Sequence, residues 1–331
     1  MRLTWIVIIR AVWISVALIG PCGVAEAQSA MGAGATLPAP LINLWLSQYR
    51  AKTGVDIQYK AVGDGGGSRL YSEGRVDFAV TSVASFISEP QPEETATPIP
   101  FLADQVAVCY NVHAVTEGLR LTPDVLAGIF LGHITRWNDP RLTRLNPSVK
   151  LPNEQINTIH HSDASTTTNT FTNYLSSRVK EWRDKVGAGK SVKWVVGFGG
   201  RGCVGVLGIL KQTEGAIGYA ELPNAIPNAV TMAALPDATG RFVLPAAGGH
   251  VSLNNPLLSA EYRISKPAVD HAYPMCGFSY VLILQSSAAK PLVKEWLSWV
   301  LTDGQSEASP LGFSSMPPEI RRQALRKLDS M

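Results

Sequence analysis

The sequence has little net charge and few cysteines, and both shortages narrow its function. There are 29 Lys and Arg residues against 26 Asp and Glu residues, so the net charge is only +3, too small to indicate a nucleic-acid-binding surface. No C-x-x-C pair or group of closely spaced histidines supports a zinc site, so we expect no metal and no other cofactor. After the first 27 residues, no segment is long and apolar enough to span a membrane. There is no internal repeat.

The first 27 residues have the pattern of a secretory signal. An apolar stretch over 3–20, preceded by a basic residue, leads to Ala25-Glu26-Ala27, which is typical of a cleavage site. A membrane anchor is the weaker interpretation because Arg10 interrupts the stretch. The proline directly before Cys22 fits a lipoprotein signal poorly. We therefore predict a signal peptide over 1–27, export to the periplasm, and a mature chain of about 300 residues, which suggests two lobes.

Three cysteines remain after this cleavage, an odd number for an oxidising compartment. Cys109 lies in an apolar run, 106–110, and is interpreted as a small buried side chain. Cys203 and Cys276 are candidates for a disulfide, but sequence separation does not reveal whether they lie within bonding distance. That pairing stays open here.

Apolar periodicity predicts strands and helices that alternate along the chain, which favours an α/β fold with largely parallel sheets. For example, Leu41, Trp45 and Tyr49 recur every four residues after Pro38 and before Gly54, as in a helix with a proline in its first turn and a glycine at its end. Prolines between 88 and 100 indicate an extended connector. The predicted strands are 55–60, 76–81, 105–111, 156–161, 216–220 and 278–284, and the predicted helices are 38–52, 122–131, 166–175, 204–212, 291–301 and 317–328.

The stretch 160–169 places hydroxyl side chains behind Asp163 where a helix is predicted to begin. The first N–H groups of a helix lack intrahelical partners and carry partial positive charge, so such a start favours an anion. Two glycine-rich turns, 32–38 and 63–67, also precede predicted helices. The second lacks the Gly-Lys-Ser/Thr ending of a nucleotide P-loop. If these three helix starts converge, they form one anion site.

Several motifs follow one another along nearly the whole mature chain: Gly32–Pro40, Tyr59–Gly67, Val76–Phe78, Trp137–Pro140, Leu145–Pro147, Asp163–Ser165, Phe171–Leu175 and Gly215–Tyr219. In this order they make the chain resemble the periplasmic phosphate-binding proteins of phosphate ABC transporters. The resemblance implies a type II periplasmic-binding-protein fold with a hinge between its lobes, lobe 1 comprising 28–108 and 272–331 and lobe 2 comprising 109–271. It also implies a monomer without enzymatic activity that closes on phosphate and delivers it to an inner-membrane permease.

The resemblance also assigns roles to individual residues. In the first lobe, the Thr36 hydroxyl and the Leu37 N–H would donate hydrogen bonds to phosphate. In the second lobe, the donors would be Ser165 and the N–H groups of Thr166 and Thr167. Asp163 would orient the basic residue beside it.

Four positions depart from the pattern of the family. Asp64 stands where serine is usual, and Ser82 replaces the aspartate that accepts the phosphate proton and so rejects sulfate. His161 replaces an arginine, which removes a bidentate guanidinium. Cys203 and the residue after it stand where asparagine and an acidic residue are common.

These departures leave several functions open. In one interpretation Asp64 takes over as the acceptor, and His161, held charged by Asp163, replaces the arginine; phosphate affinity would then fall as the pH rises through the histidine pKa. In another, the ligand is a phosphate ester, a phosphonate or another oxyanion, or there is no tight ligand. A phosphatase using His160, His161, Asp163 and Ser165 is less favoured, because a base adjacent in sequence to a nucleophile seldom has the required geometry. A sensory or adhesive role also stays open.

Overall fold

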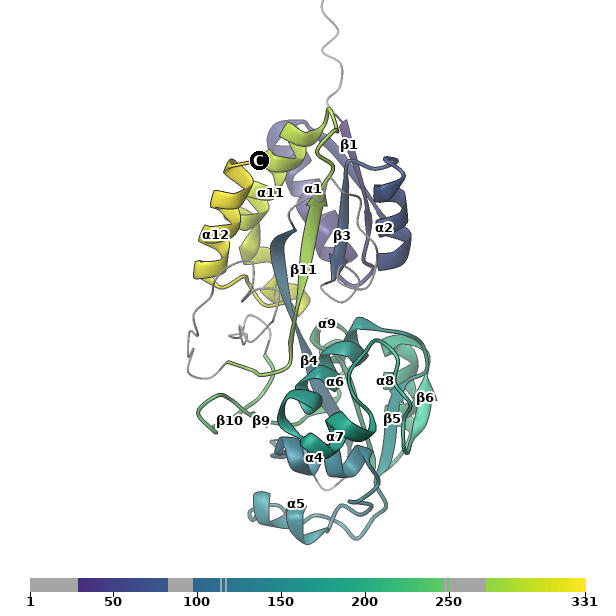
Figure 1. The fold of residues 1–331 in the computed structure, drawn as a ribbon. Helices are drawn as coiled ribbons and strands as arrows, with labels where there is room; N and C mark the ends of the chain where they lie inside the picture. Colours follow the sequence, from purple (N-terminus) through teal and green to yellow (C-terminus); the bar gives the residue numbers. More distant parts are fainter. Residues whose placement is uncertain (1–28, 83–97, 114, 117, 247–248, 250–271) are drawn as a thin grey trace, which may run out of the picture.

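The computed structural model describes residues 29–82, 98–113, 115–116, 118–246, 249 and 272–331. In Figure 1 they form two lobes, one above the other, and the long strands β4 and β11 run between them. The predicted signal peptide and most of the predicted proline-rich connector lie outside the described residues. Within the described ranges, no helix combines the length and apolar character that a membrane crossing requires.

The upper lobe is built on three parallel strands in the order β2-β1-β3, each followed or preceded by a helix. Trp45 of α1, Phe78 of β3 and Trp296 of α11 are fully buried in its core. Gly34 ends β1 with φ 145°, and a Cβ there would lie 2.0 Å from the carbonyl oxygen of Val80, so only glycine fits. The elements are β1 (Ser29–Gly34), α1 (Ala39–Thr53), β2 (Asp56–Ala61), α2 (Asp64–Ser72), β3 (Phe78–Ser82), α11 (Lys290–Leu301), the short helices η1 (Asp303–Glu307) and η2 (Ser309–Leu311), and α12 (Pro318–Asp329).

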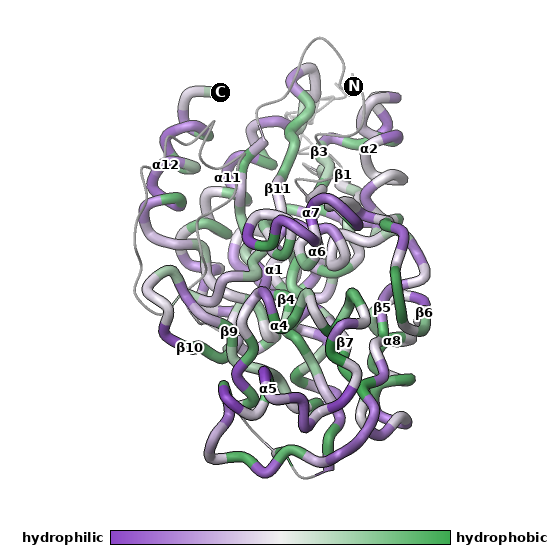
Figure 2. Tube along the Cα trace, turned by 60° about the horizontal axis from the view of Figure 1, so that its bottom comes forward, coloured by the Kyte–Doolittle hydropathy of each residue, from purple (hydrophilic) through white to green (hydrophobic). Residues whose placement is uncertain are grey.

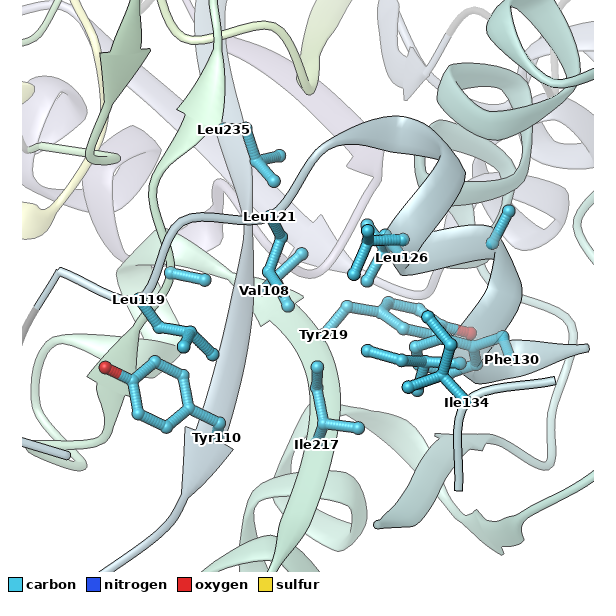
Figure 3. Packing of buried hydrophobic residues seen from close by; sticks show 14 of the residues in the cluster. Val108, Tyr110, Leu119, Leu121, Leu126, Phe130, Ile134, Ile217, Tyr219 and Leu235 are labelled. Atoms are coloured by element: carbon cyan, nitrogen blue, oxygen red, sulfur yellow. The ribbon is translucent and has the colours of Figure 1, made fainter. Parts of the chain in front are cut away.

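The lower lobe has parallel strands in the order β7-β5-β6, with helices packed around them. In Figure 3, Tyr219 of β7 and Phe130 of α4 meet in its core, near Val108 and Tyr110 of β4. The elements are α4 (Pro123–Phe130), α5 (Pro140–Leu145), β5 (Asn157–His161), α6 (Thr166–Arg178), α7 (Lys180–Lys185), β6 (Phe198–Gly200), α8 (Gly202–Gln212), β7 (Ala216–Glu221), α9 (Leu222–Ala225), β8 (Thr231–Met232), β9 (Leu235–Pro236) and β10 (Phe242–Val243).

The two connecting strands, β4 (Ile99–Asn111) and β11 (Cys276–Ile283), join the lobes into one sheet. The last residue of β3, Ser82, pairs with Ser279 of β11, which pairs with Leu102 of β4. The last residue of β7, Glu221, pairs with Val106 of β4. Since β3 and β7 run in opposite directions, their carboxyl ends face each other, and three residues of β4, 103–105, lie between them. This junction is where ligands bind in open α/β sheets.

The predicted strands and helices are found, with most ends moved by one to three residues, but the strand predicted at 105–111 begins at Ile99. The glycine-rich turn predicted at 32–38 begins inside β1, a strand that was not predicted. Strands β1 to β3 of the upper lobe and β5 to β7 of the lower lobe pair in parallel as expected, whereas β4 and β11 pair antiparallel with their neighbours. The proline-rich connector was predicted to reach residue 100, but β4 already begins at Ile99. A register shift between Ser279 and Tyr280, opposite Pro100, accommodates the missing proline N–H. Figure 2 shows that the sheet strands are largely hydrophobic and the outer helices α7 and α12 largely hydrophilic.

Candidate functional site

The N-terminus of α6 forms the second-lobe part of the predicted anion site. Ser165 is the N-cap: its Oγ accepts a hydrogen bond from Thr168 N at 3.0 Å and donates one to Thr168 Oγ1 at 2.9 Å. Thr166 and Thr167 are the first residues of the helix, so their N–H groups have no acceptor within it. The local sequence therefore produces the expected helix start with backbone donors.

His161, at the end of β5, lies behind this helix start with only 4% of its surface exposed. Its ring stacks on Tyr219 with centroids 5.4 Å apart. Its Nδ1 is 3.7 Å from Asp163 Oδ1, and its Nε2 is 3.7 Å from the sulfur of Cys203. Burial lowers the pKa of His161, and the repulsive effect of His160 adds to this, while the Asp163 carboxylate acts in the opposite direction without overcoming burial.

The expectation that Asp163 holds His161 charged is therefore wrong. The imidazole is mainly neutral at pH 7, because β7 and α8 exclude water from it. Asp163 Oδ1 instead accepts a hydrogen bond at 2.7 Å from Gly202 N, at the start of α8. The carboxylate thus joins two helix starts, and its contact with His161 is longer than a hydrogen bond.

Glu221 is a site residue that the sequence analysis did not identify. It is 7% exposed at the end of β7, where one carboxylate oxygen accepts a hydrogen bond from Thr167 Oγ1 and the other accepts one from the thiol of Cys203. Burial raises the pKa of Glu221, and nearby Asp163 raises it further. Burial, and after it the Glu221 carboxylate, hold the pKa of the Cys203 thiol far above its ordinary value, which favours the protonated thiol at neutral pH.

The disulfide left open by the sequence is not formed. Cys203, Cys276 and the buried Cys109 are all in the thiol form. The Cys276 thiol donates to the carbonyl oxygen of Tyr273 at 2.8 Å, while the Cys203 thiol is bound to Glu221.

The first lobe contributes two sequence-distant groups to the junction. Thr36 is exposed and Leu37 half-buried in the turn between β1 and α1. Asp64 is the first residue of α2 and Ser82 the last of β3, and Ser82 Oγ donates to Asp64 Oδ2 at 3.1 Å. The two residues that depart from the family pattern in this lobe are therefore direct partners.

Asp104 is the second residue at the junction that the sequence analysis did not identify. It lies in β4 between Leu102, which faces the first lobe, and Val106, which faces the second. Its pKa is raised to about 7, first by burial and then by the carboxylates of Glu221 and Asp64. An acidic residue inside the otherwise apolar run 99–103 and 106–109 was the sequence signal that could have revealed it.

The residues brought together supply hydroxyl and backbone donors and several carboxyl groups. None of the site side chains described above carries a fixed positive charge. Within the part of the chain that the structure describes, no cluster of three His, Cys, Asp or Glu residues could hold a metal ion. The arrangement is suited to binding a small oxyanion that carries protons of its own, since each carboxylate needs a donor opposite it.

The residues considered for a phosphatase are not arranged as nucleophile and base. His160 stacks on Trp194 with ring centroids 4.6 Å apart, and its Nδ1 lies 3.0 Å from its neighbour's carbonyl oxygen, an acceptor. The Ser165 hydroxyl is bound to Thr168. Neither contact activates Ser165.

Sequence comparison places the chain among phosphate-binding proteins. The family model of the PBP superfamily domain matches residues 23–304. The phosphate-binding protein PstS of Xylella fastidiosa is 34% identical over 304 residues, covering 88% of this chain and 82% of that protein. The PstS of Haemophilus influenzae is 33% identical over 312 residues, covering 91% and 93% respectively. These relatives are named as binding proteins, not enzymes.

Solved structures share the fold at lower sequence identity. A high-affinity periplasmic phosphate-binding protein solved with phosphate has a TM-score of 0.61 at 18% identity, covering 89% of this chain and 92% of its own. A putative phosphate ABC transporter substrate-binding protein from Clostridium perfringens has a TM-score of 0.56 at 16% identity, covering 87% and 100%. Their fold is the two-lobed type II arrangement predicted from the sequence. The chain therefore belongs to the PBP superfamily and, within it, to the PstS family of phosphate-binding proteins.

Proposed function

We propose that this protein is an extracytoplasmic solute-binding protein that binds inorganic phosphate between its lobes and delivers it to an ABC permease. The observation that carries the proposal is the junction itself: the carboxyl ends of β3 and β7 face each other across β4, with the donor-rich start of α6 beside them. The names of the relatives support phosphate as the ligand. Periplasmic location after removal of 1–27, a monomeric state and the permease are parts of the same proposal.

In this proposal the two lobes bind opposite sides of the anion. The Thr36 hydroxyl and the Leu37 N–H donate from the first lobe. From the second lobe come the Ser165 hydroxyl, which turns away from Thr168 Oγ1, and the N–H groups of Thr166 and Thr167. The Thr167 hydroxyl is already used by Glu221, so its backbone alone is available. These donors act at a helix N-terminus, where they favour negative charge.

In this proposal the lobes comprise residues 28–108 with 272–331 and residues 109–271. Closure requires a change in the backbone conformation of β4 and β11, because these two strands connect the lobes. A bend at the junction brings the turn at Thr36 toward the start of α6. Closure excludes water, which strengthens each hydrogen bond to the anion. The open and closed forms are the states that a permease distinguishes.

Isothermal titration calorimetry of residues 28–331 with phosphate tests the proposal. We expect saturable binding of phosphate and much weaker binding of sulfate. Ser165→Ala should weaken phosphate binding, whereas Ser177→Ala, an exposed serine on the same helix, should not. No heat of binding for phosphate, or equal effects of both substitutions, would contradict the proposal. Turnover of a chromogenic phosphate ester, abolished by Ser165→Ala, would instead indicate an enzyme.

A second candidate ligand is another oxyanion or a phosphate ester. The observation that favours it is the set of carboxyl groups Asp64, Asp104 and Glu221 beside a neutral His161, which provides acceptors but no guanidinium. Native mass spectrometry of the purified protein identifies any anion retained from the cell. Competition of that anion with phosphate in calorimetry decides between the two candidates.

A further inference from the structure

Asp104 is the middle one of the three β4 residues, 103–105, that lie between the levels at which β3 and β7 end. In the ladder it is paired with Gly277 of β11, and a Cβ at Gly277 would lie 2.7 Å from Asp104 Oδ1. The glycine therefore leaves room for the carboxyl group to lie across β11. One carboxylate from each lobe acts on Asp104: Asp64 at the start of α2 and Glu221 at the end of β7. The strand pairing and these two electrostatic effects together place the Asp104 carboxyl group between the lobes.

The two carboxylates that act on Asp104 already have hydrogen-bond donors of their own. Asp64 accepts a hydrogen bond from Ser82, and Glu221 accepts hydrogen bonds from Thr167 and Cys203. Among the described residues, no side chain donates a hydrogen bond to Asp104. Asp104 is also half-buried, so it is partly open to a ligand.

We propose that Asp104 is the specificity-determining residue of the site and shares a proton with the bound oxyanion. The inference rests on the proposed function and refines it, because it replaces Asp64 as the expected acceptor. An anion that carries a proton can donate it to Asp104, whereas sulfate faces the carboxyl group with oxygen atoms that have no proton. The pocket thus selects a protonated oxyanion.

The charges around Asp104 determine the direction of the pH dependence. Glu221 and Asp64 are the charged groups that act on it. The other neighbouring elements contribute uncharged contacts: Gly277 of β11, the uncharged helix α9, and Ile320 of α12, which packs on Ala103. A carboxylate that faces two others binds a dianion poorly unless one proton is shared. Above neutral pH, where Asp104 is ionised, hydrogen phosphate still carries a proton and brings it to the site, whereas sulfate carries none and binds only if one proton is taken up from solvent.

Linkage then gives the size of the effect. Uptake of one proton on binding lowers the affinity for sulfate about tenfold for each pH unit above neutral, whereas the affinity for hydrogen phosphate, which brings its own proton, changes little in this range. His161 does not explain such a slope, because its pKa lies below the ordinary value and the ring is already neutral in this range. The slope above neutral pH therefore distinguishes Asp104 from His161.

The test is calorimetry with phosphate and with sulfate at pH 7, 8 and 9, on the wild type and on Asp104→Asn, Asp64→Asn and Gly277→Ala. In the wild type we expect the preference for phosphate over sulfate to rise about tenfold for each pH unit above neutral, because only sulfate binding takes up a proton. Asp104→Asn should abolish this pH slope and reduce the preference by about tenfold or more, the contribution of one charge-assisted hydrogen bond. Gly277→Ala, which displaces the carboxyl group without removing it, should reduce the preference in the same direction. Asp64→Asn should retain the slope.

The outcomes separate this inference from the proposed function. Phosphate binding by the wild type with an unchanged slope and preference in Asp104→Asn overturns the role of Asp104 and leaves phosphate binding intact. Loss of the slope in Asp64→Asn alone assigns the shared proton to Asp64 and also overturns it. A wild type that binds no phosphate at any pH overturns both. Urea unfolding of each variant verifies that it is folded.

Discussion

Replacing Asp104 by asparagine should stabilise the ligand-free protein at alkaline pH. Asparagine has nearly the same shape but no charge, so the substitution removes the cost of an ionised carboxylate held near Glu221 and Asp64. At pH 4 the wild-type side chain is protonated in the folded state, and the substitution has little effect there. The variant should therefore gain stability relative to the wild type only as the pH rises.

The magnitude follows from the pKa. Folding raises the pKa of Asp104 from an ordinary value of 3.8 to about 7. Between these values the folded protein holds one proton that the unfolded chain has lost, so the free energy of unfolding falls as the pH rises. At about 1.4 kcal/mol per pH unit, the total reaches at most about 4 kcal/mol, of which about 3 kcal/mol is lost between pH 5 and pH 8.

The assay is urea unfolding of the wild type and the variant at pH 5, 6, 7 and 8 in phosphate-free buffer. Asp184→Asn is the matched control: the same chemical change on the exposed side of α7, where the carboxylate pairs with Lys180. Such surface pairs contribute less than about 1 kcal/mol. The difference between Asp104→Asn and the wild type should grow steadily from pH 5 to pH 7 and level off above it.

Parallel curves for the wild type and Asp104→Asn over this range would refute the reasoning. They would mean that the Asp104 carboxyl group ionises at the same pH in the folded and unfolded chains. The conclusion that burial and the carboxylates of Glu221 and Asp64 raise the pKa of Asp104 would then be wrong. A pH-dependent gain in Asp184→Asn of the same size would likewise show that the effect is not specific to the junction.

Three further predictions concern the lobes and their helix starts. Ser165→Ala removes the N-cap of α6 and should lower the free energy of unfolding by about 1 kcal/mol; an unchanged urea midpoint would argue against the cap. Gly34→Ala should destabilise far more than Gly54→Ala in thermal unfolding, because a Cβ at Gly34 would lie 2.0 Å from Val80 O whereas that at Gly54 meets open space; equal losses would contradict this. His161→Gln should change phosphate affinity by less than about threefold at pH 7.5, where the ring is neutral because burial lowers its pKa; a larger loss of affinity in calorimetry would mean that the ring is charged.

Most of the longer strands and helices, the start of α6 and the family were predicted from the sequence. They depend on local properties: the apolar period along α1, the proline after Thr122 that starts α4, and a hydroxyl residue before an unpaired set of N–H groups. Collinear motifs extend the same local information over the whole chain. Such patterns can be recognised from the sequence alone because residues that are neighbours along the chain produce them.

The chemistry of the site was settled only by tertiary structure. The sequence showed that an arginine and an aspartate had been replaced, but the state of His161 depends on water exclusion by Tyr219 and Cys203, which come from distant segments. Asp104 and Glu221 gained their importance from strand pairing, which places two carboxyl groups from different elements near each other. Burial and proximity between such groups decide protonation. The sequence by itself thus determined the fold and the family, and the packing of the two lobes decided how deeply the side chains at the junction are buried and in which direction their pKa values shift.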